Sequence, residues 1–378
     1  MASIRLLAQR LFDGENYHKD KVIVIDDGII SRFDDDINNF TNKVNGLVVP
    51  GFIDLQVNGG GGVLFNTTPT LAGVKSIMAA HASFGTTAML PTLITDTISV
   101  MAKAADAIAD AIANDEPGIM GIHFEGPHLS VAKKGAHSEC FIRDISDEEW
   151  QILERKDIGK VLVTLAPETV SPKDIQRMVA AGIYVSIGHT NANYQQAQSA
   201  VGAGATGFTH LFNAMSTIQG REPGVTGCAL LNDNTFCGLI VDGHHVDYVS
   251  CQLALKTKPQ GKVFLVTDAM PPVGTEAKSF AFFDRQVYLE EGKLTASTGE
   301  LAGSVLDMAT AVKNAHQHLK LPLEEALRMG SIYPANYIQA EQYGQLLPKK
   351  RANFVVLNDD LTVNSTWVAG QCIYANGA

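Results

Sequence analysis

The chain has 378 residues, of which 46% are hydrophobic and 18% are charged, and its formal net charge is −11. This length allows one large domain with a small accessory domain, and the negative charge argues against general binding to nucleic acid or to an anionic membrane. Five cysteines without a CxxC pair, no apolar run of about 20 residues and no signal-peptide pattern at the start favour a cytoplasmic protein with free thiols.

Both ends of the chain read as β-structure. Residues 1–50 contain the runs IRLLAQRLF, KVIVIDDGII and GLVVP, and residues 345–378 contain GQLLPKKRANFVVLNDD (in part), LTVNSTWVAG and QCIYANG. Runs rich in Val, Ile and Leu that are broken by Asp-Gly and Asn-Gly are typical of strands and turns. Neither end is long enough to bury a core alone, so we expect the two ends to pair into one small β-sandwich domain beside a catalytic domain of residues 51–344.

Strand-like and helix-like segments alternate between these ends. The expected strands are VPGFIDLQV, TTAMLPTLI, GIMGIHFEG, KVLVTLAPE, YVSIGHT, TGFTHLF, FCGLIVDG and KVFLVTDA. TISVMAKAADAIADAIAND carries an apolar helical stripe, and SDEEWQILERK and SPKDIQRMVAAG open with Ser and early acidic residues, which mark helix starts. The alternation predicts an α/β fold with a TIM-like (β/α)8 barrel; a doubly wound open sheet is the alternative. After the eighth strand, AKSFAFFDRQVYLEEGKLTAS predicts a β-hairpin above the barrel mouth.

Four of the expected strands end in a residue that could hold or serve a metal ion: Glu125, His189, His210 and Asp268. In a barrel the C-terminal ends of the strands meet on one face, so these side chains are expected in one pocket. Glu125, His189 and His210 have the donor atoms of a zinc site that leaves a position for water. Asp268 could take the proton of that water and return it to a leaving group. Taken singly, each residue also has a purely structural interpretation, as a hydrogen-bonded histidine or a capping carboxylate.

The first expected strand departs from a common pattern. Many barrel metallohydrolases carry His-x-His after a run like PGFID, but Gln56 and Asn58 occupy these two places here. Amides are poor zinc ligands compared with imidazole, and the end of KVLVTLAPE lacks a lysine that could bridge two metals. The sequence therefore predicts one divalent ion, with Zn²⁺ the first candidate and Fe²⁺, Co²⁺ or Mn²⁺ able to share the ligands.

Nine motifs along the chain carry a resemblance to a known family. In order they are PGFIDLQVNG, HFEGPHLS, KKGAH, GHTNA, THLFNAM, GREPG, DGHHV, TDAM and LAGS. Together they resemble the N-acetylglucosamine-6-phosphate deacetylase family of the amidohydrolase superfamily, over nearly the whole chain. The resemblance implies hydrolysis of the acetamide of N-acetyl-D-glucosamine 6-phosphate to D-glucosamine 6-phosphate and acetate. It also implies a homodimer in which the partner subunit can supply part of the phosphate site.

The resemblance assigns roles to individual residues. It matches Glu125, His189 and His210 with the metal ligands and Asp268 with the general base and acid. The residues that it matches with substrate contacts are Ala136, Asn213, Ala214, Arg221, His245, Leu301, Ala302 and Gly303.

Several roles remain open at this point. Arg221 could present a planar fork to the phosphate or be an ordinary surface arginine, and His137 could polarise the acetyl carbonyl or brace its loop. His245 could bind phosphate or a sugar hydroxyl. The alternative functions are an amidohydrolase that acts on a cyclic amide or base, and a barrel scaffold without catalysis. The missing His-x-His pair argues against the first alternative, and the presence of all four strand-end residues argues against the second.

Overall fold

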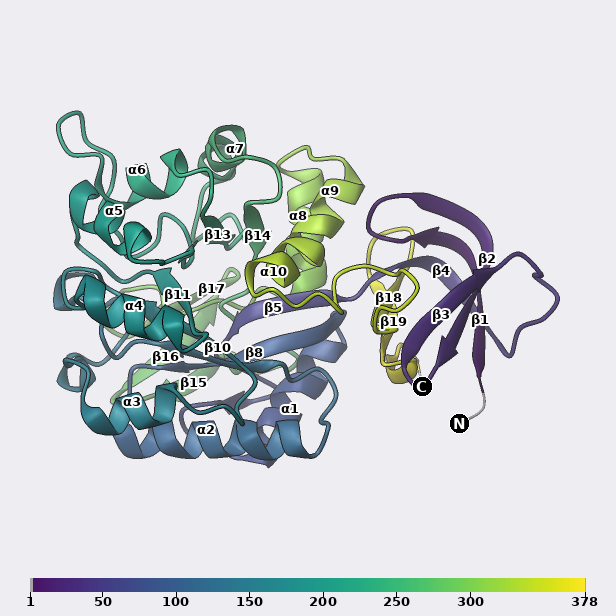
Figure 1. Ribbon diagram of the computed structural model, residues 1–378, viewed down its shortest axis with the longest axis horizontal. Coiled ribbons are helices and arrows are strands. Elements are labelled where there is room, and N and C mark those ends of the chain that lie inside the picture. The colour runs from purple at the N-terminus through teal and green to yellow at the C-terminus, as the bar shows by residue number, and fades with distance from the viewer. Residues whose placement is uncertain (1–2, 378) are drawn as a thin grey trace.

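The computed structural model describes residues 3–377, which form a barrel and a separate sheet (Figure 1). The eight parallel barrel strands are β5 (Phe52–Val57), β8 (Thr86–Ile94), β9 (Gly121–Glu125), β10 (Lys160–Leu165), β11 (Tyr184–Ile187), β12 (Gly207–Phe208), β13 (Phe236–Leu239) and β14 (Val263–Leu265). They are hydrogen-bonded in this order, and a parallel bridge from Val57 to Ala269 nearly closes the barrel. All eight predicted strands are present, and the predicted fold class is confirmed.

Helices surround the barrel. They are α1 (Leu71–Ala82), α2 (Ile98–Ala113), α3 (Asp147–Leu153), α4 (Pro172–Ala180), α5 (Tyr194–Gly202), α6 (Gly224–Leu231), α7 (Tyr248–Thr257), α8 (Met308–Gln317), α9 (Leu323–Met329) and α10 (Ile332–Tyr337). The predicted stripe of α2 is buried at Met101, Ala104 and Ile108, so this helix exists because one face is apolar. The predicted start signals are real caps: Ser146 forms a capping box with Glu149 at α3, and Ser171 caps α4.

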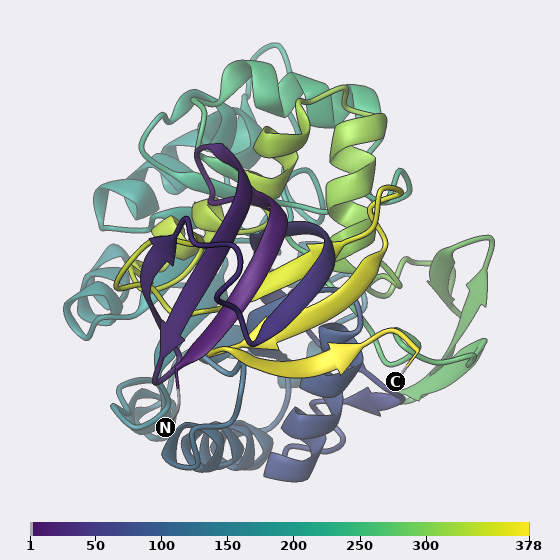
Figure 2. The same ribbon diagram turned by 90° about the vertical axis from the view of Figure 1, so that its right-hand side faces the viewer.

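The two ends of the chain form a single seven-stranded sheet. Its strands are β1 (Ile4–Phe12), β2 (Tyr17–Asp26), β3 (Ile29–Asp34), β4 (Asn42–Pro50), β18 (Phe354–Leu357), β19 (Val363–Val368) and β20 (Gln371–Ala375), in the order β20-β19-β18-β4-β1-β2-β3. β18 pairs antiparallel with β4, and Figure 2 shows the strands from the two ends lying side by side. A small apolar cluster including Leu6, Val48 and Phe354 gives this sheet its own core.

The segment after β14 forms one strand more than the predicted hairpin. β15 (Ser279–Phe282), β16 (Arg285–Glu290) and β17 (Lys293–Ala296) make a three-stranded antiparallel sheet. Phe282, Val287 and Leu294 of this sheet pack with Ile94 at the end of β8. The small sheet therefore lies at the C-terminal end of the barrel, where the candidate site is. None of the helices formed by residues 3–377 has the length and apolar character needed to span a membrane.

Candidate metal and substrate site

The three predicted ligands converge on one point. The Nε2 atom of His210 lies 3.0 Å from Nε2 of His189 and 3.1 Å from Oε1 of Glu125, and Nε2 of His189 lies 3.2 Å from the same Oε1. Glu125 is the last residue of β9, whereas His189 and His210 follow β11 and β12 by two residues. All three side chains are buried. The strand ends of the barrel therefore bring together residues that are up to 85 positions apart.

The backbone at these strand ends is unusual. His189, His210 and Asp268 have φ angles of 46°, 31° and 53°, in the left-handed region that residues with a side chain rarely adopt. Such conformations cost about 1 to 3 kcal/mol each and persist where the surrounding structure enforces them, often at functional sites. Three of the four strand-end residues share this feature, which indicates that the turn after each of these strands is shaped for the side chain that it carries.

The donor atoms fit a metal ion. Ligand distances of about 2.05 Å in a tetrahedral zinc site place neighbouring ligand atoms about 3.3 Å apart, close to the observed separations. The Nδ1 atom of His189 donates to the backbone carbonyl of Lys133 at 2.9 Å, which leaves the lone pair on Nε2 directed at the other ligands. Lone pairs that face one another repel unless a cation or proton lies between them. Glu125, His189 and His210 could thus hold one divalent ion.

The charges at the site are coupled. Burial alone would raise the pKa of Glu125, but hydrogen bonds and charges of His189 and His210 outweigh it and hold that pKa well below its usual range. For His210, burial lowers the pKa, but the Glu125 carboxylate reverses the effect and raises it. An ionised carboxylate between two imidazoles is the arrangement that attracts a divalent cation.

The side-chain amides of Gln56 and Asn58 donate hydrogen bonds to Asp268, and that of Gln56 also donates to the metal-ligand candidate Glu125. Asn58 Nδ2 donates to Oδ1 of Asp268 at 2.6 Å, and Gln56 Nε2 donates to the same oxygen at 3.2 Å and to Oε1 of Glu125 at 3.1 Å. Burial and, to a smaller extent, the nearby Glu125 carboxylate raise the pKa of Asp268 to about 6. The N–H groups of Gln56 and Asn58 thus point at carboxylates, where the common pattern has two metal-binding histidines. This geometry supports a single ion.

A cavity of about 400 Å³ opens above these residues. The substrate contacts predicted from the resemblance that line it are Ala136, Asn213, Ala214, His245, Leu301 and Gly303. Ala302 is fully buried beside them. Arg221 lies in an exposed loop and does not line the cavity of its own chain. The structure thus gathers most of the predicted contacts but leaves the expected phosphate-binding arginine outside.

Two histidines of the cavity are held by neighbours. His245 Nδ1 lies 2.7 Å from Oδ2 of Asp242, which fixes the ring and leaves Nε2 as its free nitrogen. His137 Nδ1 lies 2.8 Å from the hydroxyl of Thr95, and burial lowers the pKa of His137 to about 3, so the ring is neutral. His123 lies below the site between the hydroxyls of Thr92 and Thr164, and burial lowers its pKa to about 4.

Sequence reasoning missed several lining residues. Lys133, Phe282 and Glu300 all line the cavity. Lys133 stands in the motif KKGAH and could have been noticed there, but Phe282 and Glu300 reach the cavity only through the fold of the β15–β17 segment. Glu300 is paired with Arg285 at 2.5 Å. No local sequence pattern predicts that Phe282 and Glu300 line the cavity.

The chain is similar in sequence to a known family and to characterised proteins. Residues 47–373 match the family described as "Amidohydrolase family". N-acetylgalactosamine-6-phosphate deacetylase of Shewanella sp. (strain ANA-3) is 50% identical over 330 residues, covering 87% of this chain and 84% of the relative. N-acetylglucosamine-6-phosphate deacetylase of Haemophilus influenzae is 36% identical over 325 residues, covering 85% of each chain.

Solved structures agree over almost the full length. N-acetylglucosamine-6-phosphate deacetylase from Pasteurella multocida has a TM-score of 0.94 and 37% identity, covering 99% of this chain and 100% of that one. A Mycobacterium smegmatis N-acetyl-D-glucosamine-6-phosphate deacetylase, an aspartate-to-alanine mutant in complex with N-acetyl-D-glucosamine-6-phosphate, has a TM-score of 0.92 and 28% identity, covering 99% and 100%. Both the barrel and the sheet from the chain ends are therefore shared with these enzymes.

Proposed function

The chain belongs to the amidohydrolase family, and we propose that it removes the acetyl group from N-acetyl-D-glucosamine 6-phosphate. The products are D-glucosamine 6-phosphate and acetate. The observation that carries this proposal is the convergence of Glu125, His189 and His210 with Asp268 in one cavity of about 400 Å³. The matches to deacetylases over most of the chain supply the substrate class. Five free cysteines support a location in the cytoplasm.

The resident metal is one divalent ion held by Glu125, His189 and His210. A ligand set of two imidazoles and one carboxylate favours Zn²⁺, and Fe²⁺, Co²⁺ and Mn²⁺ can use the same donors. When bound, such an ion lowers the pKa of water and polarises a carbonyl group. Gln56 and Asn58 donate hydrogen bonds where a second ion would need ligands, so the expected content is one ion per chain.

The protein's own groups move the protons. Oδ1 of Asp268 is fixed by Asn58 and Gln56, so Oδ2 is the oxygen that accepts a proton from the attacking water. The same carboxyl then protonates the departing sugar nitrogen. Nδ1 of His137 is engaged with Thr95, which leaves Nε2 to donate a hydrogen bond to the acetyl oxygen as negative charge develops there.

The galacto epimer is a second candidate substrate, because the relative with 50% identity is an N-acetylgalactosamine-6-phosphate deacetylase. Acetate release should be measured with both 6-phosphates and with unphosphorylated N-acetylglucosamine. We expect kcat/KM to be at least about a hundredfold lower without the phosphate, because two charge-assisted hydrogen bonds contribute roughly 3 kcal/mol or more. Comparable kcat/KM values with and without phosphate, or faster hydrolysis of dihydrouracil as a cyclic amide, would contradict the proposal. A higher kcat/KM for the galacto epimer would reassign the sugar.

A homodimer in which Arg221 serves the neighbouring chain explains its exposed position. Apolar residues are exposed on the loop that carries Arg221, at the end of α6 and on α7: Ile218, Leu231, Val249 and Leu253, with 48 to 72% of each residue accessible. Because α6 and α7 contact each other, these exposed side chains support a protein interface at this place. A second copy that covers these side chains would bring its own Arg221 toward a cavity that needs a cation for the phosphate.

Subunit mixing tests this arrangement. Arg221→Ala and Asp268→Asn homodimers should each be nearly inactive, but mixed dimers should recover about half of the wild-type activity per dimer. If Arg221 acts across the interface, one of the two mixed sites combines an intact Asp268 with an intact Arg221. Controlled dissociation and remixing, followed by kcat/KM measurement, provides the readout. Absence of recovery in mixed dimers confirmed by native mass spectrometry, or a monomeric mass for the wild type, would refute a shared site.

A further inference from the structure

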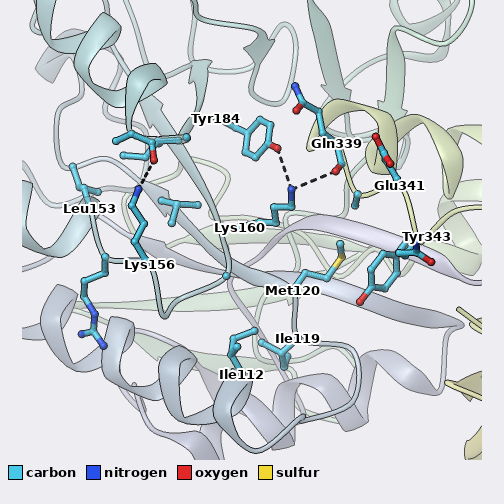
Figure 3. A pocket seen from close by; sticks show the side chains of 18 residues that line it. Ile112, Ile119, Met120, Leu153, Lys156, Lys160, Tyr184, Gln339, Glu341 and Tyr343 are labelled. Atoms are coloured by element: carbon cyan, nitrogen blue, oxygen red, sulfur yellow. Dashed lines mark hydrogen bonds between the residues drawn. The ribbon is translucent and has the colours of Figure 1, made fainter. Parts of the chain in front are cut away.

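A second cavity lies at the opposite end of the barrel from the metal site. Its volume is about 700 Å³, and its lining includes Lys160 and Tyr184, the first residues of β10 and β11 (Figure 3). Glu125 and His189 stand at the other ends of β9 and β11. In barrel enzymes the N-terminal end of the strands serves stability rather than catalysis. The size of the cavity is within the range of small-molecule sites, about 300 to 1,000 Å³.

The floor of this cavity is apolar. Its aliphatic and thioether side chains are Ile112, Ile119, Met120, Leu153, Val161 and Ile183. The rings of Tyr184 and Tyr343 stand at the wall, and Figure 3 shows them on two sides of the Lys160 side chain. Aromatic rings and a thioether are groups against which a flat aromatic body packs favourably. Burying such a body here would remove apolar surface from water on both partners.

Charged side chains also line the cavity. Three cationic residues, Arg155, Lys156 and Lys160, line the cavity with one acidic residue, Glu341. Arg155 is neutralised by Asp106 at 2.6 Å and Asp157 at 2.8 Å. The two lysines remain as cations, in a protein whose net charge is −11.

The two lysines donate to neutral oxygens. Lys160 Nζ donates to the hydroxyl of Tyr184 at 3.2 Å and to the carbonyl of Gln339 at 3.3 Å, and Lys156 Nζ donates to the carbonyl of Ala181 at 2.6 Å. Within residues 3–377 neither ammonium group forms an ion pair. Each ammonium has three N–H groups, so both keep donor capacity for an anion. The anion would lie at the rim while the attached ring lies on the apolar floor.

We propose that this cavity is a binding site for a small organic anion with an aromatic body. The two lysines that donate only to neutral oxygens would bind the anionic part of the ligand, and the tyrosine rings and apolar floor would bind the aromatic part. The residues that line the cavity include no Cys, Ser, Thr or His, and the proposal is for binding alone. This site is independent of the deacetylase function. A ligand bound there would stabilise the folded chain, because it binds the native state and not the unfolded one.

Fluorescence titration with 1-anilinonaphthalene-8-sulfonate, an aromatic sulfonate, tests the site. We expect saturable binding of about one probe per chain that saturating glucosamine 6-phosphate does not displace. Lys160→Met should weaken binding roughly tenfold, because it removes a charged hydrogen-bond donor. Ala181→Phe should nearly abolish binding, because the ring occupies the cavity. Lys103→Met, on the exposed face of α2 and outside this lining, is the matched control.

Deacetylase activity reports whether each variant is folded, because the metal site lies at the other end of the barrel. Both cavity variants should keep wild-type kcat/KM for the acetylated substrate. Three results would overturn the proposal: no saturable binding to the wild type, equal affinity in the wild type and in active Lys160→Met and Ala181→Phe proteins, or displacement by glucosamine 6-phosphate. A probe affinity that falls in both cavity variants and not in Lys103→Met would support it.

Discussion

Asp268→Asn is expected to lower turnover at least about a hundredfold while metal content and substrate binding stay close to those of the wild type. The amide keeps the shape of the carboxyl and can remain hydrogen-bonded near Asn58, but it cannot accept the proton of the attacking water. The measurements are kcat for acetate release, the metal content of the purified protein and the affinity for the substrate. Near-normal turnover would remove Asp268 from the central role.

The control for this variant should reproduce its backbone conformation. Asp115→Asn is suitable, because Asp115 is exposed and has a φ of 49°, close to the 53° of Asp268.

The pH profile of kcat/KM gives a second readout for Asp268. Burial raises the pKa of Asp268 to about 6, and a bound cation opposes this shift, so the acid limb of kcat/KM should lie at or below pH 6. Activity should fall about tenfold per pH unit below the limb, because the base must be ionised. The limb should disappear in Asp268→Asn.

His210→Ala is expected to abolish metal binding and to reduce kcat/KM by about a thousandfold or more. The substitution leaves Glu125 and His189 as two ligands, one fewer than a catalytic zinc site uses. Metal analysis should give about one ion per wild-type chain and less than about 0.1 in the variant after dialysis. His18→Ala, in the sheet formed by the chain ends, is the matched control.

Two outcomes would contradict this expectation. Full metal content with full activity in His210→Ala would exclude the histidine as a ligand. Two ions per wild-type chain would contradict the one-ion assignment that the donated hydrogen bonds of Gln56 and Asn58 support. Chelation followed by addition of single ions then identifies the metal that restores activity, with Zn²⁺ the expected one.

The convergence of the four strand-end residues could be predicted, because the C-terminal ends of all strands in a parallel barrel lie on the same face. Once Glu125, His189, His210 and Asp268 are each placed just after a strand, strand direction alone brings them to one face. The prediction of one ion also came from the sequence, because the ligand chemistry of Gln56 and Asn58 depends on residue type, and the number of ions stays a prediction. The left-handed backbone at three of these positions was not accessible, since it depends on how the following loops pack.

Other features depend on packing between segments that are distant in the sequence. The third strand of the β15–β17 sheet pairs through a turn that the alternation pattern does not specify. Glu300 lines the cavity and is paired with Arg285, whereas Arg221 lies outside the cavity of its own chain, in the exposed segment 217–222. The cavity near Lys160 is formed by residues from Ile112 to Tyr343, so no local pattern marks it.

The pairing of β4 with β18 has a consequence for how the protein is made. Pro50 pairs with Phe354, so about 300 residues must be synthesised before the sheet can be completed. At about 5 to 20 residues per second the edge of β4 waits roughly 15 to 60 seconds for its partner. An unpaired apolar edge such as Leu47–Val49 can associate with other chains during that interval. The nascent chain therefore escapes aggregation only if association at this edge is slow, or if a chaperone covers the edge until the last strands leave the ribosome.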